Sequence, residues 1–154
     1  MTQEYFSVVL SSNINLAIAL DSIRTIAQVE TKNICAIPGV ANFWYGVVNF
    51  KGSLLWILDC DRYFNLDSRQ NAHSKKLTII VIKRDRDSRQ VALVTSKLTG
   101  IITVDSEFKQ LTNSASSELA NCCDNITIDD NKSTYILNSD RLLKQLHQQS
   151  MVSV

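Results

Sequence analysis

The sequence predicts a mostly β protein of small antiparallel barrels, with one short helix near the C-terminus. Apolar stretches of about four to eight residues recur along the chain and are separated by tight turns. An amphipathic strand buries its apolar face readily when its sheet curls upon itself, so this rhythm favours small barrels. Near the end of the chain, Leu142, Leu143 and Leu146 instead share one helical face.

Alternating apolar residues predict paired strands at the start of the chain. Residues 5–10 and 16–20 each place their apolar side chains on one face, and the polar turn at residues 11–13 separates them. The alternation continues at residues 23–29, where Ile, Thr, Ala and Val share a face. This segment predicts a third strand.

The stretch at residues 37–59 carries most of the special backbone residues of the chain. It holds the only proline and three of the four glycines. Proline fixes one backbone angle and glycine opens positive ones, so Pro38 and Gly39 predict a rigid turn. Gly46 and Gly52 mark positions where the chain bends or where another backbone comes close.

The same stretch predicts a β-hairpin. Residues 47–51 form a short strand that runs into a turn, and residues 53–58 form a strand that is apolar on both faces. Lys51 lies near the tip of this hairpin. Trp44 and Tyr45 point to opposite sides of an extended segment, so only one of them enters the core.

A polar segment at residues 67–76 predicts a linker, and a second block of strands follows it. Residues 77–82 form a buried strand, which is joined to residues 91–95 through a charged hairpin tip at residues 83–89. Residues 101–104 predict a further short strand after Gly100. This block repeats the strand rhythm of the first.

The pattern is weaker in the last third of the chain. Residues 112–123 fit a loop or one to two helical turns, and the sequence leaves both alternatives open. Residues 134–137 predict a last strand. Asp140 is expected to cap a helix at about residues 140–149, and the residues from 150 onward are expected to fray.

Composition limits the classes of function. The 154 residues carry 16 Lys and Arg against 15 Asp and Glu, a formal charge of +1, which gives no long-range field for a nucleic acid. No apolar run approaches the roughly 20 residues that span a bilayer, and the first residues do not resemble a signal peptide. We therefore expect one cytoplasmic domain with no nucleic acid partner and no membrane insertion.

Cysteine and histidine offer few routes to chemistry. The residues are Cys35, Cys60, Cys122, Cys123, His73 and His147, and no pair of cysteines forms a CxxC motif. Because zinc-ligand spacing is missing, we expect no metal site and no cofactor, and reduced thiols are the simple interpretation. A small β-barrel enzyme that uses Cys60 or Cys123 is a rival hypothesis, since a histidine partner would be close only in space.

Asp59 and Asp61 flank Cys60 and resemble a catalytic pair of carboxylates. A catalytic pair would need a histidine, a phosphate-binding loop or a glycine-rich segment nearby, and the sequence offers none of these next to it. We therefore interpret Asp59 as a cap at the end of a strand and Asp61 as a surface residue.

The sequence motifs of the central stretch resemble those of the CheW-like domain family. Three motifs follow the signature of that family in order and spacing: Ile-Pro-Gly at 37–39, Gly-Val-Val-Asn-Phe-Lys-Gly at 46–52, and Trp-Ile-Leu-Asp at 56–59. Weaker similarity extends over nearly the whole chain. The resemblance implies a single domain over residues 1–154, made of two small SH3-like five-stranded barrels packed together. The expected bounds are about 14–68 for the first barrel and about 76–138, with a contribution of 4–11, for the second.

The resemblance also implies a function. CheW-like domains are coupling proteins of bacterial chemotaxis and related motility pathways. The chain would then be a non-enzymatic adaptor, a monomer in isolation, that links the cytoplasmic tip of a chemoreceptor to the regulatory domain of a CheA-type histidine kinase in membrane-bound receptor arrays. A scaffold of the same form for type IV pilus or light-directed motility is the alternative.

By matched position, the resemblance places the receptor contact near Ile23, Thr25, Gly46, Asn49 and Lys51. The family usually has arginine at the position of Lys51, and lysine keeps the charge but loses the planar fork. Thr25 stands where the family has glutamate, a departure that bears on partner choice. No motif places the kinase contacts, although the second barrel is the family expectation.

Overall fold

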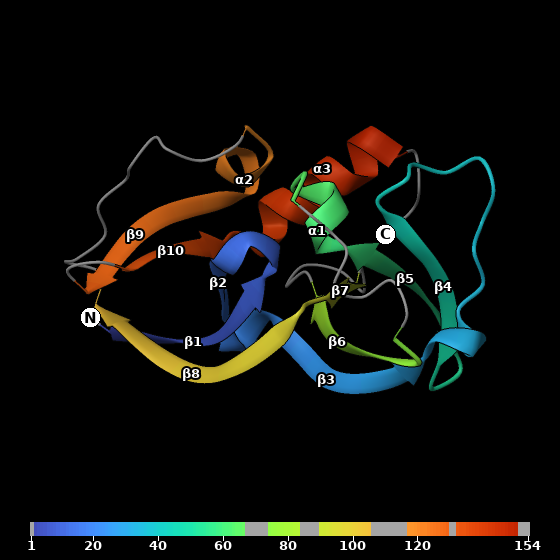
Figure 1. Cartoon of the computed structure of the whole chain (residues 1–154), viewed down its shortest axis with the longest axis horizontal. Coiled ribbons are helices and arrows are strands. Elements are labelled where there is room, and N and C mark those ends of the chain that lie inside the picture. Colours follow the sequence, from blue (N-terminus) through green and yellow to red (C-terminus); the bar gives the residue numbers. More distant parts are fainter. Residues whose placement is uncertain (1, 67–73, 84–89, 106–116, 130–131, 151–154) are drawn as a thin grey trace.

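The computed structural model describes residues 2–66, 74–83, 90–105, 117–129 and 132–150 (Figure 1). This part of the chain forms ten strands and three α-helices. The strands are β1 (Thr2–Leu10), β2 (Ile14–Ala19), β3 (Ile23–Glu30), β4 (Trp44–Phe50), β5 (Ser53–Asp59), β6 (Lys76–Lys83), β7 (Gln90–Val94), β8 (Lys97–Asp105), β9 (Cys123–Asp129) and β10 (Lys132–Leu137). The helices are α1 (Cys60–Tyr63), α2 (Ser117–Cys122) and α3 (Ser139–Ser150).

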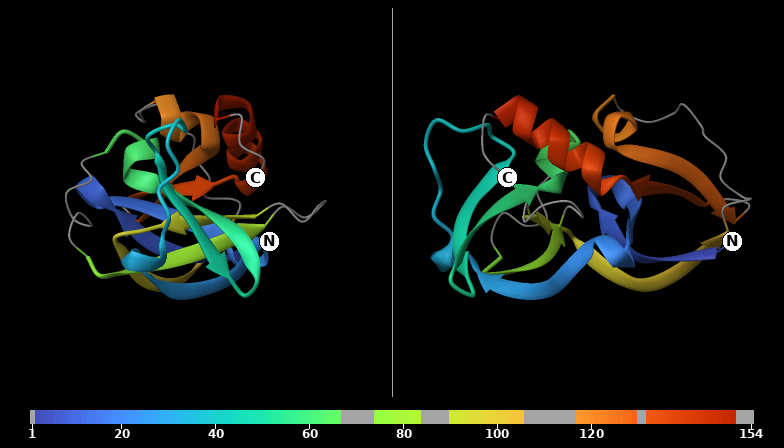
Figure 2. Two further views of the ribbon diagram at one scale, coloured as in Figure 1. Left: turned by 90° about the vertical axis from the view of Figure 1, so that its right-hand side faces the viewer. Right: turned by 180° about the vertical axis from the view of Figure 1, so that it is seen from behind.

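The strands form two five-stranded sheets that lie side by side along the molecule (Figures 1 and 2). Sheet A has the order β8-β1-β2-β10-β9, and sheet B has the order β3-β6-β7-β5-β4. In each sheet the third and fourth strands of this order pair in parallel, and the other neighbours pair antiparallel. Figure 2 shows α3 running across the junction of the two sheets. The prediction of a mostly β fold with two packed barrels is confirmed.

The expected bounds of the two barrels, about 14–68 and 76–138, are wrong. β6 and β7 follow residue 68 but join sheet B, whereas β2 precedes it and joins sheet A. The reason is that β5 pairs in parallel with β7 and β2 pairs in parallel with β10, across long stretches of chain. Apolar alternation records which face of a strand is buried and not which strand lies beside it, so it could not reveal these partners.

In the part of the chain that the structure describes, three apolar cores hold the sheets. The central core lies between the sheets and combines buried residues of both with α3, among them Leu16, Leu58 and Leu143. A second core lies within sheet B, around Ile57 and Ile79, and the core of sheet A consists in the described residues of Tyr5, Ala17, Val104 and Ile136. Because the central core takes side chains from both sheets, neither sheet packs independently of the other.

The C-terminal helix is confirmed, but its expected cap is wrong. α3 buries Leu142, Leu143 and Leu146, as their spacing predicts. The backbone N–H of Arg141 donates to the Asn138 side chain at 3.0 Å, so Asn138 rather than Asp140 caps the helix. Asp140 lies in the first turn, where the negative charge of a carboxylate interacts favourably with the helix dipole. The residues 151–154, expected to fray with Ser150, lie outside the described part.

The other predicted elements divide into three groups. The opening strand pair, the third strand and both hairpins are confirmed. Residues 112–116 lie outside the described part; after them α2 supplies six helical residues, and β9, which follows α2, was not predicted. Residues 67–73 of the expected linker and 84–89 of the charged hairpin tip lie outside the described residues.

Candidate functional site

The tip of the β4–β5 hairpin is a two-residue turn formed by Lys51 and Gly52. Both residues have positive φ, 51° and 82°, and Phe50 pairs with Ser53 across the turn. Such a turn matches the right-handed twist of the two strands. The Gly52 N–H donates to the Asn49 side chain at 3.1 Å, and the Lys51 Nζ lies 5.4 Å from the centre of the Phe50 ring. The turn therefore holds an exposed cation in a defined place.

Gly46 lies on β4 where another stretch of backbone comes close, as predicted. A Cβ at this position would overlap the carbonyl oxygen of Cys35 and would lie 2.9 Å from a methyl group of Ile34. Two backbone hydrogen bonds join Cys35 to Val47, at 2.8 and 2.9 Å. Gly46 thus allows the chain after β3 to close onto β4.

The segment between β3 and β4 turns at Pro38 and Gly39, which has φ +83°, as the sequence predicts. Beyond the turn, Phe43 packs partly buried against the central core and meets the Tyr63 ring edge-on at 5.0 Å. The Asn42 carbonyl accepts a hydrogen bond from the Arg62 side chain at 3.3 Å. The turn therefore belongs to a loop that is tied to α1.

The five expected receptor contacts form two groups. Gly46, Asn49 and Lys51 lie on β4 and its turn, whereas Ile23 and Thr25 lie at the start of β3. β3 and β4 are the two edges of sheet B, and Figure 1 shows that β3 begins near the middle of the molecule, where the sheets meet. There Ile23 packs partly buried against the central core.

Two large apolar side chains are exposed in the described residues, and sequence reasoning missed both. Leu54, next to the hairpin turn, is 66% exposed and lies on the strand that the sequence predicts to be apolar on both faces. Ile101, on β8, is 59% exposed and lies opposite Phe6 of β1. Successive side chains of a strand point to opposite faces, so Leu54 faces away from the buried Leu55, and Ile101 faces away from the buried Val104. This alternation along each strand is the signal that could have identified the two as outward positions.

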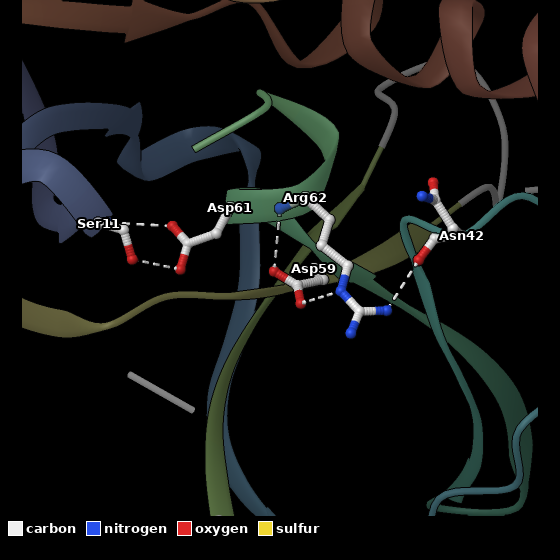
Figure 3. Close-up of polar contacts among 5 residues, drawn as sticks. All are labelled: Ser11, Asn42, Asp59, Asp61 and Arg62. Carbon is white, nitrogen blue, oxygen red and sulfur yellow. Dashed lines mark hydrogen bonds and ion pairs between the residues drawn. The ribbon is translucent and has the colours of Figure 1, made fainter. Parts of the chain in front are cut away.

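The two carboxylates around Cys60 have different environments (Figure 3). Asp59 ends β5 and caps α1, a helix that the sequence did not predict, since its side chain accepts from the Arg62 N–H at 3.3 Å. Asp61 was expected at the surface, and that expectation is wrong: it is 3% exposed. Its carboxylate accepts from the Ser11 N–H at 3.0 Å and from the Ser11 hydroxyl at 2.7 Å, so the turn between β1 and β2 of sheet A supplies its buried partners.

The buried cysteines lie in the central core. Burial raises the pKa of the Cys60 thiol well above its ordinary value, and the nearby Asp59 and Asp61 raise it further. Burial also raises the pKa of Cys122 and Cys123. A thiol with a raised pKa carries little thiolate at neutral pH, which disfavours a nucleophile at Cys60 or Cys123.

The described residues contain no group of three His, Cys, Asp or Glu side chains placed to bind a metal ion. No helix in the described ranges is long and apolar enough to span a membrane. Around Cys122, the side chains instead contact one another: its Sγ lies 3.9 Å from the Tyr63 hydroxyl and 3.4 Å from the Gln145 side chain. These contacts join α1, α2 and α3 across the junction of the sheets.

Comparison with known proteins gives a consistent assignment. The structure is similar to the crystal structure of the scaffolding protein TtCheW from Thermoanaerobacter tengcongensis, with a TM-score of 0.74, 16% identity and 90% coverage of each chain. This similarity establishes the fold. A search of curated proteins gave no match. The model of the CheW-like domain matches residues 4–147, nearly the whole chain. The chain therefore belongs to the CheW-like domain family.

Proposed function

We propose that this protein is a non-enzymatic adaptor that couples methyl-accepting chemoreceptors to a CheA-type histidine kinase at membrane-bound receptor arrays. The family assignment supports a scaffold, and TtCheW, which has the same fold, is named a scaffolding protein. The burial of Cys60 and Cys123 removes the support for the rival enzyme hypothesis.

The observation that carries the proposal is that, among the side chains that the structure describes, each sheet exposes one large apolar residue. Leu54 lies at the hairpin tip of sheet B, and Ile101 lies on the edge strand of sheet A. An adaptor needs two separate faces, because both partners must bind the same molecule at the same time. The family assignment is the reason to expect two partners, and each exposed apolar side chain marks one face on which a partner could bind.

The receptor contact is proposed at the hairpin tip and at the start of β3. Lys51 and Asn49 offer an ammonium group and a side-chain amide beside the exposed Leu54, on a turn that Gly52 fixes. A lysine at the rim of an apolar contact favours a partner that carries a carboxylate or amide oxygen. The kinase contact is proposed on sheet A, away from this hairpin.

A reconstituted mixture of receptor tip fragments and kinase tests the bridging function. Kinase activity that depends on the receptor should first rise with added adaptor and then fall, because excess copies occupy receptors and kinases singly. A curve that climbs to a plateau would indicate strongly cooperative assembly. No response with any pair of receptor and kinase would count against the adaptor function.

The variant Lys51→Glu tests the receptor contact. It should weaken binding to receptor tip fragments while the free energy of unfolding stays within about 0.5 kcal/mol, as for other exposed substitutions. Lys144→Glu, at an exposed position of α3, is the matched control and should leave binding unchanged. Wild-type affinity of Lys51→Glu would remove Lys51 from the contact.

A further inference from the structure

β8 is an edge strand with one side unused by the described sheet. It pairs antiparallel with β1 from Asp105 back to Lys97, with a bulge at Thr99, which has no register partner on β1, and with Gly100 at φ +117°; it ends the strand order of sheet A. The side away from β1 therefore carries backbone N–H and C=O groups that a further strand could bond. Alternate residues of β8 are exposed along most of its length, and Ile101, at its middle, is 59% exposed.

The outward residues of β8 have a self-complementary order. They are Lys97, Thr99, Ile101, Thr103 and Asp105, of which the first four are exposed and Asp105 is half-buried. The two charged residues stand at the two ends of β8, equally far from Ile101, and have opposite signs. The two threonines stand equally far from it between them. A strand with this order fits an antiparallel copy of itself.

We propose that two copies of this protein associate through β8, antiparallel, with Ile101 at the two-fold axis. Lys97 of each copy then lies opposite Asp105 of the other, and Thr99 lies opposite Thr103. Directly opposed charges of opposite sign, threonine pairs and an apolar centre are the cross-strand pairs that stabilise antiparallel strands. A two-fold interface of this kind uses the same patch on both copies, as closed dimers do.

This pairing goes beyond the adaptor function and does not depend on it, because it concerns the chain alone. It does have a consequence for that function. The paired state covers Ile101, the exposed apolar residue on sheet A, while the hairpin tip with Lys51 stays accessible. A monomer is then the dominant state only in dilute solution, and pairing would withdraw the sheet A face from a partner.

Charge reversal tests the pairing by sedimentation velocity of the full chain over a range of concentrations at low salt. Lys97→Glu and Asp105→Lys should each weaken association about tenfold or more, since each creates two like-charge pairs. An equimolar mixture of the two variants should associate again, because the introduced glutamate of one copy then lies opposite the introduced lysine of the other. The double variant should also recover. A merely destabilising effect of either substitution would not be repaired by mixing.

A cross-link fixes the register. In a Cys35→Ser background, Ile101→Cys places two thiols opposite each other at the two-fold axis and should form a disulfide-linked dimer under mild oxidation. Leu54→Cys, at the other exposed apolar position, lies away from β8 and is the control, which should form no disulfide-linked dimer. A wild-type chain that remains monomeric at all concentrations would overturn the proposal. It would mean that Lys97 and the bulge opposite Ser7 and Val8 protect the edge.

Discussion

Sheets A and B have the same pairing pattern but different paths along the sequence. Both place one parallel pair among antiparallel neighbours. Sheet B takes its strands from one continuous part of the chain, β3 to β7, whereas sheet A joins β1 and β2 to β8, β9 and β10. The same arrangement therefore closes over short sequence distances in one sheet and over nearly the whole chain in the other. Bringing together strands that are far apart in the sequence costs more chain entropy, and this entropy is lost before the stabilising contacts form.

The difference shows why the junction of the sheets matters for stability. Sheet A is completed only when the N-terminal and C-terminal parts meet, and both parts pack on the central core that sheet B also uses. Ser11, between β1 and β2, bonds Asp61 of α1, the helix that follows β5 of sheet B. Contacts at the junction should therefore affect both sheets, and contacts within the β4–β5 hairpin should affect sheet B alone.

The largest effect is expected from Phe64→Ala in the central core. Phe64 is fully buried and lies edge-on to Tyr63 at 5.2 Å. The loss of its ring should lower the free energy of unfolding by about 3–5 kcal/mol. Denaturant unfolding measures this loss, and hydrogen exchange should show weaker protection in β2 and β10 as well as in β5 and β7. Loss of protection in sheet B alone would contradict a shared core.

Asp61→Ala tests the polar link between the sheets. It removes the acceptor of two buried hydrogen bonds and leaves the Ser11 N–H without this partner, so we expect a loss of about 2–3 kcal/mol. Ser11→Ala keeps its backbone donor and should cost less. A double-mutant cycle of the two variants gives their coupling, and a coupling energy near zero would show that the link does not join the sheets energetically.

A smaller and local effect is expected from Gly52→Val at the hairpin tip. Gly52 has φ +82°, and a Cβ added there would meet no heavy atom within 4 Å, so backbone strain rather than a clash opposes the substitution. A β-branched residue there should cost about 1–3 kcal/mol, measured by denaturant unfolding. Gly52→Asn is the matched control, because asparagine tolerates positive φ. Equal stability of both variants and the wild type would contradict this account.

Local features of the structure were predictable from the sequence, and distant partners were not. Gly46 and Gly52 indicated a close approach of two backbone segments and a tight turn, because glycine lacks a Cβ and adopts positive φ readily. Asp61 looked like a surface residue because the serine that buries it lies 50 residues away. The strand partners of β5 and β2 were hidden for the same reason. The receptor contacts rest on matched position, and the sheet order separates Ile23 and Thr25 from the hairpin.

The smallest effect is a pH dependence at Asp59, whose contacts are local to the end of β5. Burial, the largest cause, raises the pKa of this carboxyl above its ordinary value of 3.8, although the Arg62 N–H opposes the shift. The folded protein therefore keeps this proton to higher pH than the unfolded chain. The favourable contribution of Asp59 is complete below about pH 3.8 and is lost as the pH rises through the pKa of the folded state.

Asp59→Asn should therefore gain stability relative to the wild type as the pH rises from about 3 to 7. Asparagine stays neutral and keeps the oxygen that caps α1, so it avoids the burial of a charge without losing the cap. Urea unfolding of both proteins at several pH values measures the difference in free energy. Asp59→Ala should show the same slope at a lower stability throughout, since it loses the cap as well. A flat difference would mean that the ion pair with Arg62 balances burial, and a difference that falls with rising pH would mean that it outweighs burial; either result contradicts the prediction.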